Sequence, residues 1–346
     1  MTKPRVVSLF SGAGGMDLGF TQAGFEVIWA NEWNKVACKT YRHNFGDHII
    51  CGDIREISSD DVPDCDVIIG GPPCQGFSVA GKMDPNDTRN QMVWEFCRIV
   101  LAKRPQFFVM ENVAALGQNP KFNLLHDDLI RTFMEEGYTV TYKVLNSKDY
   151  ETPQSRERFF IIGSLGVPVV FPEPILKTIS VREAIADLQP PKQQTCVAKI
   201  TICPNPVLRK SPYTGMLFNG ARPLNLEKPS CTLVASMGGN RTPIVEQNLL
   251  NNPQAKSWVA SIYNLIKTNR VIPTDVPSYI RRLTVAECAR LQGFPDDFIF
   301  IGAFTKQYRQ IGNSVPPPLA KHIGLSVMGS INGVVPEISE TILGLF

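Results

Sequence analysis

The sequence predicts an α/β protein in which a mostly parallel sheet carries helices on both faces and a smaller, loop-rich domain follows. In the first 165 residues, short β-rich runs alternate with helix-compatible stretches, as in strands joined by helical crossovers. From about residue 165 onward, closely spaced prolines break any long helix. Regular helical patterns return only near residues 284 and 318. These observations together indicate a first part of alternating strands and helices and a second part rich in loops.

The expected strands are short runs rich in apolar and β-branched residues. They cover residues 6–10, 26–30, 66–69, 107–110, 140–144 and 159–163. The expected helices cover residues 91–102, 124–136, 284–291 and 318–328. Because sheets of this class bind ligands at the carboxyl ends of their strands, we expect functional residues directly after the strand runs.

Length and composition are those of an ordinary globular protein. The chain has 346 residues, of which 43% are hydrophobic and 19% charged, enough for a sizeable core. No apolar window of about 18 residues occurs and the amino terminus lacks the layout of a signal peptide, so we expect no membrane span. The nine scattered cysteines include no CxxC pair. We therefore expect no disulfide framework and no metal site, and a cytoplasmic location.

Charge is unevenly distributed along the chain. The net charge is +3, but residues 191–282 contain twelve basic and three acidic side chains, so the rest of the chain carries −6. A basic segment of this kind is typical of a surface that binds a polyanion. The alternative is a solvated surface that only keeps the protein in solution. We favour a nucleic-acid partner.

A glycine-rich loop follows the first expected strand. Residues 11–19 read SGAGGMDLG, and these glycines permit a tight turn and close approach of a ligand to the backbone. The dinucleotide fingerprint G-x-G-x-x-G needs glycine where this chain has Asp17, which disfavours a pyrophosphate ligand and a nicotinamide dehydrogenase. Glu32 is placed to accept hydrogen bonds from ribose hydroxyls, and Asp53 from an exocyclic amine. We predict a nucleoside-containing cofactor, with a plain turn as the alternative.

A cysteine lies on a stiff loop after the third expected strand. Residues 70–78 read GGPPCQGFS and follow the apolar run 67–69. Cys74 thus stands behind two prolines and among small residues. A thiolate is a strong nucleophile, so this segment suggests covalent catalysis by Cys74. The alternative is a prolyl turn with an incidental cysteine.

Two further segments supply an acid and cationic groups. Glu111 follows the run 107–110, and a carboxylate at the end of a buried strand is costly unless paired or protonated, so we expect an acid with a raised pKa. The alternative is a helix N-terminal region, where acids are also favoured. Gln154, Arg156 and Arg158 would project to one face of an extended chain. They would surround an anion or hold the nucleophile loop, unless this triplet is simply solvated.

These segments, taken together, resemble those of bacterial-type DNA (cytosine-5)-methyltransferases, in the order of that family and over nearly the whole chain. The matching segments are SLFSGAGG at 8–15, GPPCQGFS at 71–78, ENV at 111–113, QSRER at 154–158, RRLT through RLQGFP at 281–295, and QIGNSVP at 310–316. Between residues 185 and 280 only Thr232-Leu233 matches, which fits the family's variable target-recognition domain. That stretch includes most of the basic segment.

The resemblance implies a Rossmann-like S-adenosylmethionine-dependent methyltransferase domain, residues 1–184 with 303–346, and a target-recognition domain, residues 185–302. It implies sequence-specific methylation of C5 in a cytosine that is extruded from double-stranded DNA. Cys74 would attack C6 and Glu111 would contact or protonate N3. By the same resemblance, Arg156 would be the partner of the thiol and base, and Arg158 would support the loop.

The resemblance also assigns binding residues. The cofactor positions, which would hold S-adenosylmethionine or the product S-adenosylhomocysteine, are Phe10, Gly12, Gly14, Glu32, Trp33, Asp53, Ile54, Pro73, Asn313 and Val315. Trp33 would pack on adenine, although a core tryptophan is an alternative. The expected DNA-contacting residues are Gln75, Ser78, Arg89, Thr232 and Arg241.

Two rival functions are weighed against this one. An RNA cytosine-5 methyltransferase of the tRNA-modifying branch shares the fold, but the long basic variable region and the QGFS sequence after Cys74 fit the DNA branch better. A catalytically dead DNA-binding regulator would have lost Cys74, Glu111 or Arg156, and all three are present. We expect a monomeric modification enzyme of a restriction-modification system, with a possible cognate endonuclease encoded nearby.

Overall fold

The computed structural model describes residues 2–73, 91–188, 196, 198–268 and 275–333. The chain divides into two compact units. The first comprises Met1–Tyr150, Glu157–Ile175 and the chain from Val315 onward, and the second comprises Glu151–Arg156 and Leu176–Ser314. The second unit thus extends beyond the predicted recognition domain on both sides. The assignment of cofactor and DNA binding to separate domains stays a prediction.

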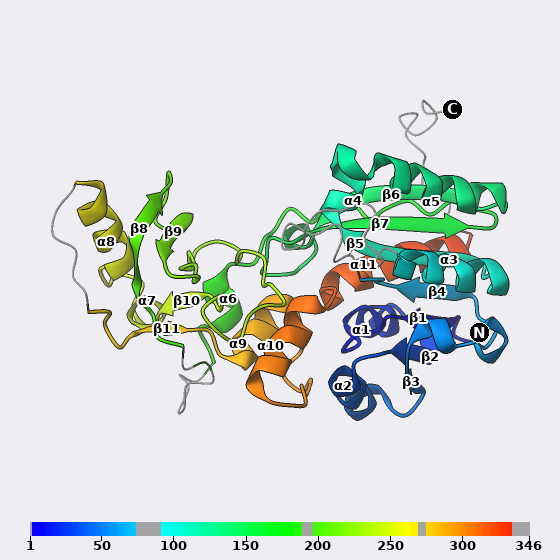
Figure 1. The fold of residues 1–346 in the computed structure, drawn as a ribbon, viewed down its shortest axis with the longest axis horizontal. Coiled ribbons are helices and arrows are strands. Elements are labelled where there is room, and N and C mark those ends of the chain that lie inside the picture. Colours follow the sequence, from blue (N-terminus) through cyan, green and yellow to red (C-terminus); the bar gives the residue numbers. More distant parts are fainter. Residues whose placement is uncertain (1, 74–90, 189–195, 197, 269–274, 334–346) are drawn as a thin grey trace. The chain divides into compact units, whose positions relative to one another are not determined.

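The first unit is built on a seven-stranded sheet in the order β3-β2-β1-β4-β5-β7-β6 (Figure 1). The strands are β1 (Arg5–Leu9), β2 (Glu26–Glu32), β3 (Ile49–Cys51), β4 (Val67–Gly70), β5 (Phe107–Val113), β6 (Thr139–Asn146) and β7 (Glu157–Ser164). Neighbours from β3 to β5 are parallel, whereas β7 runs antiparallel to both β5 and β6. The predicted mostly parallel sheet is confirmed.

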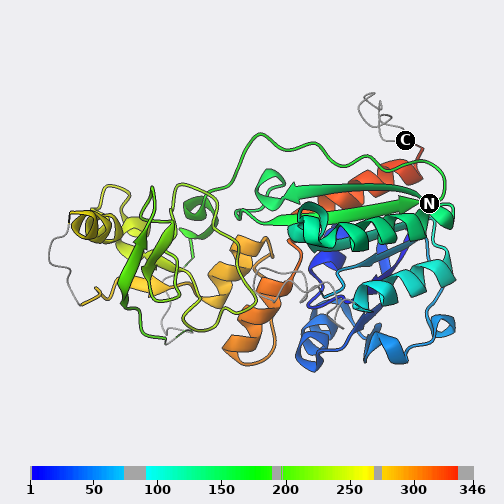
Figure 2. The same cartoon turned by 45° about the horizontal axis from the view of Figure 1, so that its top comes forward.

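Helices cover both faces of this sheet (Figure 2). They are α1 (Gly15–Gln22), α2 (Lys35–Phe45), α3 (Gln91–Lys103), α4 (Ala114–Gln118), α5 (Asn123–Glu135) and α11 (Pro317–Ile331), with short 3-10 turns η1 (Ile54–Glu56), η2 (Ser59–Asp61), η4 (Pro120–Phe122) and η5 (Ser147–Asp149). Successive residues of a strand point to opposite faces, so Val6 joins the core under α1 and α11 while Val7 joins the core under α3 and α5. A doubly covered sheet explains why central strand β4 and the first half of β5 are continuous apolar runs.

The predicted strands correspond to β1, β2 and β4 to β7, with their ends shifted by a few residues. Strand β3 and helix α2 are not among the predicted elements, because neither has a clear apolar pattern. Strand β3 has only three residues, and α2 is largely polar in sequence. The start of α2 does have a local signal, because the Asn34 side chain accepts hydrogen bonds from the amides of Val36 and Ala37.

The second unit contains two small antiparallel sheets and short helices. Its strands are β8 (Ile202–Leu208) paired with β9 (Gly215–Phe218), and β10 (Ile244–Glu246) paired with β11 (Ile280–Arg282). Its helices are α6 (Val181–Ile185), α7 (Gln247–Asn251), α8 (Trp258–Lys267), α9 (Val285–Gln292) and α10 (Phe304–Asn313). This unit has its own hydrophobic core, which includes Phe218, Val259 and Ile262. The proline-rich sequence predicts this succession of short elements.

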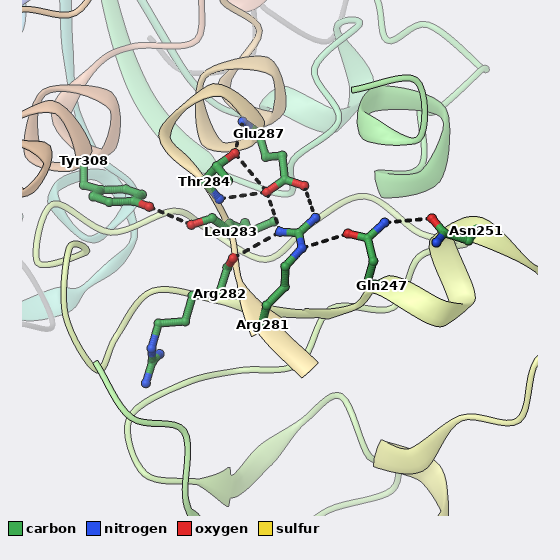
Figure 3. A network of polar contacts seen from close by, with 8 residues as sticks. All are labelled: Gln247, Asn251, Arg281, Arg282, Leu283, Thr284, Glu287 and Tyr308. Atoms are coloured by element: carbon green, nitrogen blue, oxygen red, sulfur yellow. Dashed lines mark hydrogen bonds and ion pairs between the residues drawn. The ribbon is translucent and has the colours of Figure 1, made fainter. Parts of the chain in front are cut away.

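A buried polar network joins β11 to α9 (Figure 3). Arg281 donates two hydrogen bonds to the Glu287 carboxylate, at 2.9 and 2.6 Å. Glu287 also accepts from the Thr284 amide, while the Thr284 hydroxyl accepts from the Glu287 amide. This capping box starts α9 at the residue where the sequence predicts a helix. Helix α9 ends at Gly293, which adopts a left-handed conformation.

Candidate active site

The glycine loop after β1 is held by the end of β2. Phe10, Gly12 and Gly14 all have positive φ, and the Ser11 amide donates to the Asn31 carbonyl at 3.0 Å. A Cβ at Gly12 would meet no heavy atom within 4 Å, so the loop is open there. A Cβ at Gly14 would lie 2.2 Å from the Phe45 ring, so Gly14 is also required for packing against α2. An open backbone turn at the start of a helix suits a ligand that approaches the chain closely.

Glu32 fastens this loop to the start of α2. Its carboxylate accepts from the Gly12 amide at 3.0 Å and from the Asn34 amide at 2.7 Å. Burial raises the pKa of Glu32, and these amide hydrogen bonds oppose the shift. A carboxylate with two such bonds retains acceptor capacity for a hydroxyl group. The neighbouring Trp33 is 73% exposed, so the core-tryptophan alternative is wrong.

Asp53 and Ile54 follow β3 at the same edge of the sheet. Asp53 caps η1 by accepting from the Arg55 amide, and it forms an ion pair with the Arg55 guanidinium at 2.5 Å. The hydrogen bond from Arg55 lowers the pKa of Asp53, so this carboxylate is charged at neutral pH. The Ile54 side chain is buried in the core, and therefore only its main chain remains for a ligand.

Glu111 forms an ion pair with Arg158. Strands β5 and β7 are antiparallel neighbours with Val113 opposite Arg158, which brings the Arg158 side chain back over Glu111. Arg158 Nε lies 2.8 Å from Glu111 Oε1, and the two side chains are only 14% and 12% exposed. Such a pair stabilises the charged carboxylate, opposite in sign to the effect of burial alone.

The loop that leads to Cys74 lies against the same carboxylate. A Cβ at Gly71 would be 3.0 Å from Glu111 Oε2, so glycine permits this close approach. The Asn112 side-chain amide donates to the Pro72 carbonyl at 3.3 Å. Pro73 is half-buried. Cys74 lies outside the described residues, together with three predicted DNA-contacting residues, Gln75, Ser78 and Arg89.

Sequence comparison decides the family. The family model described as C-5 cytosine-specific DNA methylase matches residues 4–328. The chain belongs to the C-5 cytosine-specific DNA methylases. It is 35% identical over 342 residues to the Type II methyltransferase M.MthTI of Methanothermobacter thermautotrophicus, covering 95% of this chain and 98% of the relative. It is 37% identical over 329 residues to M.FnuDI of Fusobacterium nucleatum, covering 91% and 92%.

Solved structures support the fold of this methylase. The Schizosaccharomyces pombe Dnmt2 methyltransferase aligns with a TM-score of 0.69 at 18% identity, covering 96% of this chain and 99% of the other. The Entamoeba histolytica methyltransferase EhMeth aligns with a TM-score of 0.70, also at 18% identity, with the same coverage. The predicted DNA cytosine-5 methyltransferase class is confirmed by the family match, and methylases of this family use S-adenosylmethionine in general.

The two arginines of the methylase's QSRER segment lie in different surroundings. Arg158 is the arginine paired with Glu111. The roles that the resemblance implies, Arg156 as partner of the thiol and base and Arg158 as support of the loop, stay predictions. Arg156 is 2% exposed and donates to the carbonyls of Leu233 and Gly312 at 2.9 and 2.8 Å. Gln154, Arg156 and Arg158 do not share one face of a strand, contrary to the prediction. Strand β7 begins only at Glu157, and Gln154 and Arg156 belong to the second unit.

The remaining predicted residues of the methylase are dispersed. Val315 is buried in the core of the first unit, whereas Asn313 is exposed at the end of α10 in the second. Thr232 is exposed and its hydroxyl donates to the Ser155 carbonyl at 2.9 Å. Arg241 is exposed and donates to the Ser236 hydroxyl at 3.2 Å. The roles of these four residues in ligand binding stay predictions.

In the described part of the methylase, no group of three or more His, Cys, Asp or Glu side chains could hold a metal ion. Within the same described part, no helix is long and apolar enough to cross a membrane.

The sequence shows Asp17 only as a departure from a dinucleotide fingerprint, but in the structure its side chain links the glycine-rich segment to β1 and α2. Asp17 is fully buried and accepts from the Ser8 hydroxyl at 2.9 Å and the Tyr41 hydroxyl at 2.7 Å. Burial raises the pKa of Asp17 to about 6, against the two hydrogen bonds. The Tyr41 hydroxyl also lies 3.1 Å from His48 Nε2, which extends the network to the turn before β3.

This buried acid predicts a pH dependence of stability. The folded protein holds the Asp17 proton more tightly than the unfolded chain, so stability falls as pH rises from about 4 to about 6 and then levels off. The full effect is at most roughly 3 kcal/mol. Asp17→Asn should flatten this part of the pH profile of urea-unfolding midpoints. Asp47→Asn, at a surface carboxylate that is 94% exposed, should leave the profile unchanged. An unaltered slope in Asp17→Asn would contradict the assignment.

The Glu111–Arg158 pair predicts a catalytic defect separate from binding. Glu111→Gln keeps the shape but removes the acid, and should lower the rate constant of methyl transfer by about 10²- to 10⁴-fold, the usual contribution of a positioned proton donor. Single-turnover methyl transfer at saturating DNA measures the effect. Glu157→Gln, at the exposed neighbour of Arg158, is the control. A normal rate in Glu111→Gln would remove Glu111 from the mechanism.

Proposed function

We propose that this methylase transfers a methyl group to C5 of a cytosine within a defined sequence of double-stranded DNA. The observation that carries the proposal is the ion pair of Glu111 and Arg158 beside the loop that runs through Gly71 and Pro72 toward Cys74. An acid, a cation and a nucleophile-bearing loop at the carboxyl ends of neighbouring strands β4 and β5 form a reaction centre of the type that open α/β sheets carry.

The chemistry follows from the electron distribution of cytosine. C5 is a poor nucleophile until the Cys74 thiolate adds to C6, which forms an S–C6 bond and moves electron density to C5. Glu111, once it has taken up a proton from solvent, gives that proton to N3 during this addition, and Arg158 promotes the transfer by stabilising the carboxylate that remains. After C5 has gained the methyl group, the C5 proton passes to water, the S–C6 bond breaks to release the Cys74 thiolate, and the N3 proton returns to Glu111, which restores the aromatic ring.

The glycine loop and the ends of β2 and β3 fit a nucleoside-containing methyl donor. Gly12 is open to a ligand, Trp33 offers an exposed ring for adenine, and the Glu32 carboxylate could accept hydrogen bonds from ribose hydroxyls. The charged Asp53 carboxylate can accept from an exocyclic amine. Bound S-adenosylmethionine would supply the methyl group as an electrophile. Phe10, Gly14, Ile54, Pro73, Asn313 and Val315 are proposed to complete this site.

The substrate base is inaccessible within a duplex, so we propose that it is extruded into the reaction centre. The basic segment 191–282 supplies phosphate contacts that offset the cost of extrusion. Thr232 and Arg241 are the exposed described residues proposed to face DNA, with Gln75, Ser78 and Arg89 from the catalytic loop. We also propose a monomer in the cytoplasm that protects DNA against a cognate endonuclease.

Transfer of labelled methyl groups to plasmid DNA and to tRNA tests the function. We expect incorporation into plasmid DNA, and bisulfite sequencing should show one methylated sequence. Incorporation into tRNA alone would support the RNA alternative. DNA binding without incorporation into either substrate would support the dead-regulator alternative.

A further inference from the structure

Arg282 is a fully buried cation whose partners are main-chain carbonyls. It lies at the end of β11 and is 0% exposed. Its guanidinium donates to the carbonyls of Ala198 at 2.8 Å, Lys199 at 3.3 Å, Asn240 at 3.0 Å and Thr242 at 2.8 Å. These four hydrogen bonds occupy most of the five N–H groups of arginine.

None of these four acceptors carries a charge. The adjacent Arg281 shows the usual solution for a buried arginine, because it pairs with the Glu287 carboxylate (Figure 3). The Arg282 guanidinium instead exchanges its water partners for neutral carbonyl groups when it is buried. Burial also lowers the pKa of Arg282. Such an arrangement costs free energy, and its effect is to order the backbone segments whose carbonyls it binds.

One of those segments is an exposed loop that precedes β10. Asn240 and Thr242 lie in this loop, residues 234–243, which we call the clamped loop. Its inner side is buried through Met237 and Thr242, and the Thr242 hydroxyl accepts from the Gly238 amide at 2.9 Å. Its outer side exposes Ser236, Asn240 and Arg241. The loop therefore has a fixed inner side and a polar, cationic outer side.

The beginning of the clamped loop is held in the same way. Arg156 donates to the Leu233 carbonyl at 2.9 Å, and the Leu233 amide donates to the Gln154 side chain at 2.8 Å. Buried guanidinium groups thus bind the backbone just before the loop and near its end. Arg241 is the one cation within residues 234–243, and its Nη1 is directed to Ser236 across the loop.

We propose that Arg282 is a positioning residue for DNA recognition, because its hydrogen bonds fix the clamped loop so that Arg241 is presented to DNA in one orientation. The proposal rests on the proposed function. An arginine held in a single orientation can make the paired hydrogen bonds that distinguish guanine from other bases, whereas a mobile arginine offers charge alone. Arg282 therefore governs the choice of sequence without touching DNA.

Steady-state methylation of a cognate duplex and of single-base variants tests the proposal. Arg282→Lys keeps the charge but cannot reach four carbonyls at once. We expect it to raise KM for the cognate duplex about 10- to 100-fold and to reduce discrimination against variants, while kcat and the Kd of S-adenosylmethionine stay within about twofold. Arg241→Ala should show the same pattern. The double variant should be no worse than Arg241→Ala, because Arg282 acts through Arg241.

Arg182→Met is the matched control. The Arg182 guanidinium also donates to main-chain carbonyls, those of Leu249 and Leu250, but away from the clamped loop. It should leave discrimination unchanged. If Arg282→Lys does not fold, Thr242→Val removes the bond to the Gly238 amide and should show a milder form of the same defect. Normal discrimination in folded Arg282→Lys, or in Thr242→Val, would overturn the proposal.

Hydrogen exchange of the DNA-free protein separates this proposal from the proposed function. In Arg282→Lys the amides of Gly238 and Thr242 should exchange at least about tenfold faster, while those of β1 and β4 remain unchanged. Suppose that the Gly238 and Thr242 amides exchange faster in Arg282→Lys but the wild-type protein does not methylate DNA. The role of Arg282 in ordering the clamped loop would then stand, and the proposed function would be rejected. Unchanged exchange at both amides would reject the clamp even if DNA methylation is confirmed.

Discussion

Replacing Cys74 by Ala is expected to abolish methyl transfer, by at least about 10⁴-fold, because no other group would form the bond to C6 that makes C5 reactive. A duplex with 5-fluorocytosine at the target position gives a second measurement. Fluorine at C5 cannot leave as a proton does, so the wild-type protein should remain covalently bound to the DNA after methyl transfer. Denaturing gel electrophoresis should show this adduct with the wild type and none with Cys74→Ala.

Cys65→Ala is the appropriate control for this experiment. Cys65 lies just before β4, the strand that leads to the catalytic loop, and burial raises its pKa to about 12. Its thiol is therefore protonated and unreactive at neutral pH. We expect this variant to form the adduct at the wild-type rate. An adduct that survives Cys74→Ala would exclude Cys74 as the nucleophile, whatever the rate of methylation.

Glu287→Ala is expected to cost about 3–5 kcal/mol of unfolding free energy, a large fraction of the stability of a domain. Glu287 is 3% exposed and is the carboxylate partner of buried Arg281. Its removal leaves the Arg281 guanidinium buried without this counter-charge. It also removes the acceptor of the Thr284 amide at the start of α9. Urea unfolding followed by circular dichroism and tryptophan fluorescence measures the loss.

The capping box of α6 supplies the control for Glu287→Ala. Ser180 and Glu183 form the same reciprocal hydrogen bonds as Thr284 and Glu287, but Glu183 is exposed. Glu183→Ala therefore removes a capping box without leaving a buried charge, and it should cost much less. Glu287→Gln should fall between the two, since an amide keeps part of the hydrogen bonding. Equal losses in Glu183→Ala and Glu287→Ala would show that the buried pair adds nothing beyond capping.

Local sequence was sufficient for much of the first unit. Strands β1, β4 and β5 are buried on both faces, so their apolar runs are continuous and are recognised directly. The glycine loop and the acidic residues at the ends of β2 and β5 also lie where parallel strands are expected to carry ligand-binding groups. The small sheets of the second unit gave no comparable signal. Strands β10 and β11 have three residues each, and their pairing joins segments far apart in the chain.

The sequence by itself determined the chemical groups of this protein, their order along the chain and their place at strand ends, because these depend on neighbouring residues. Only the tertiary structure decided which arginine meets Glu111. The register of β5 against β7 brings Arg158 to the carboxylate, while the second unit holds Arg156. Only the fold, likewise, brings Arg282 to the carbonyls of Asn240 and Thr242. A side chain's partners across the chain depend on long-range packing, which no local pattern of residues encodes.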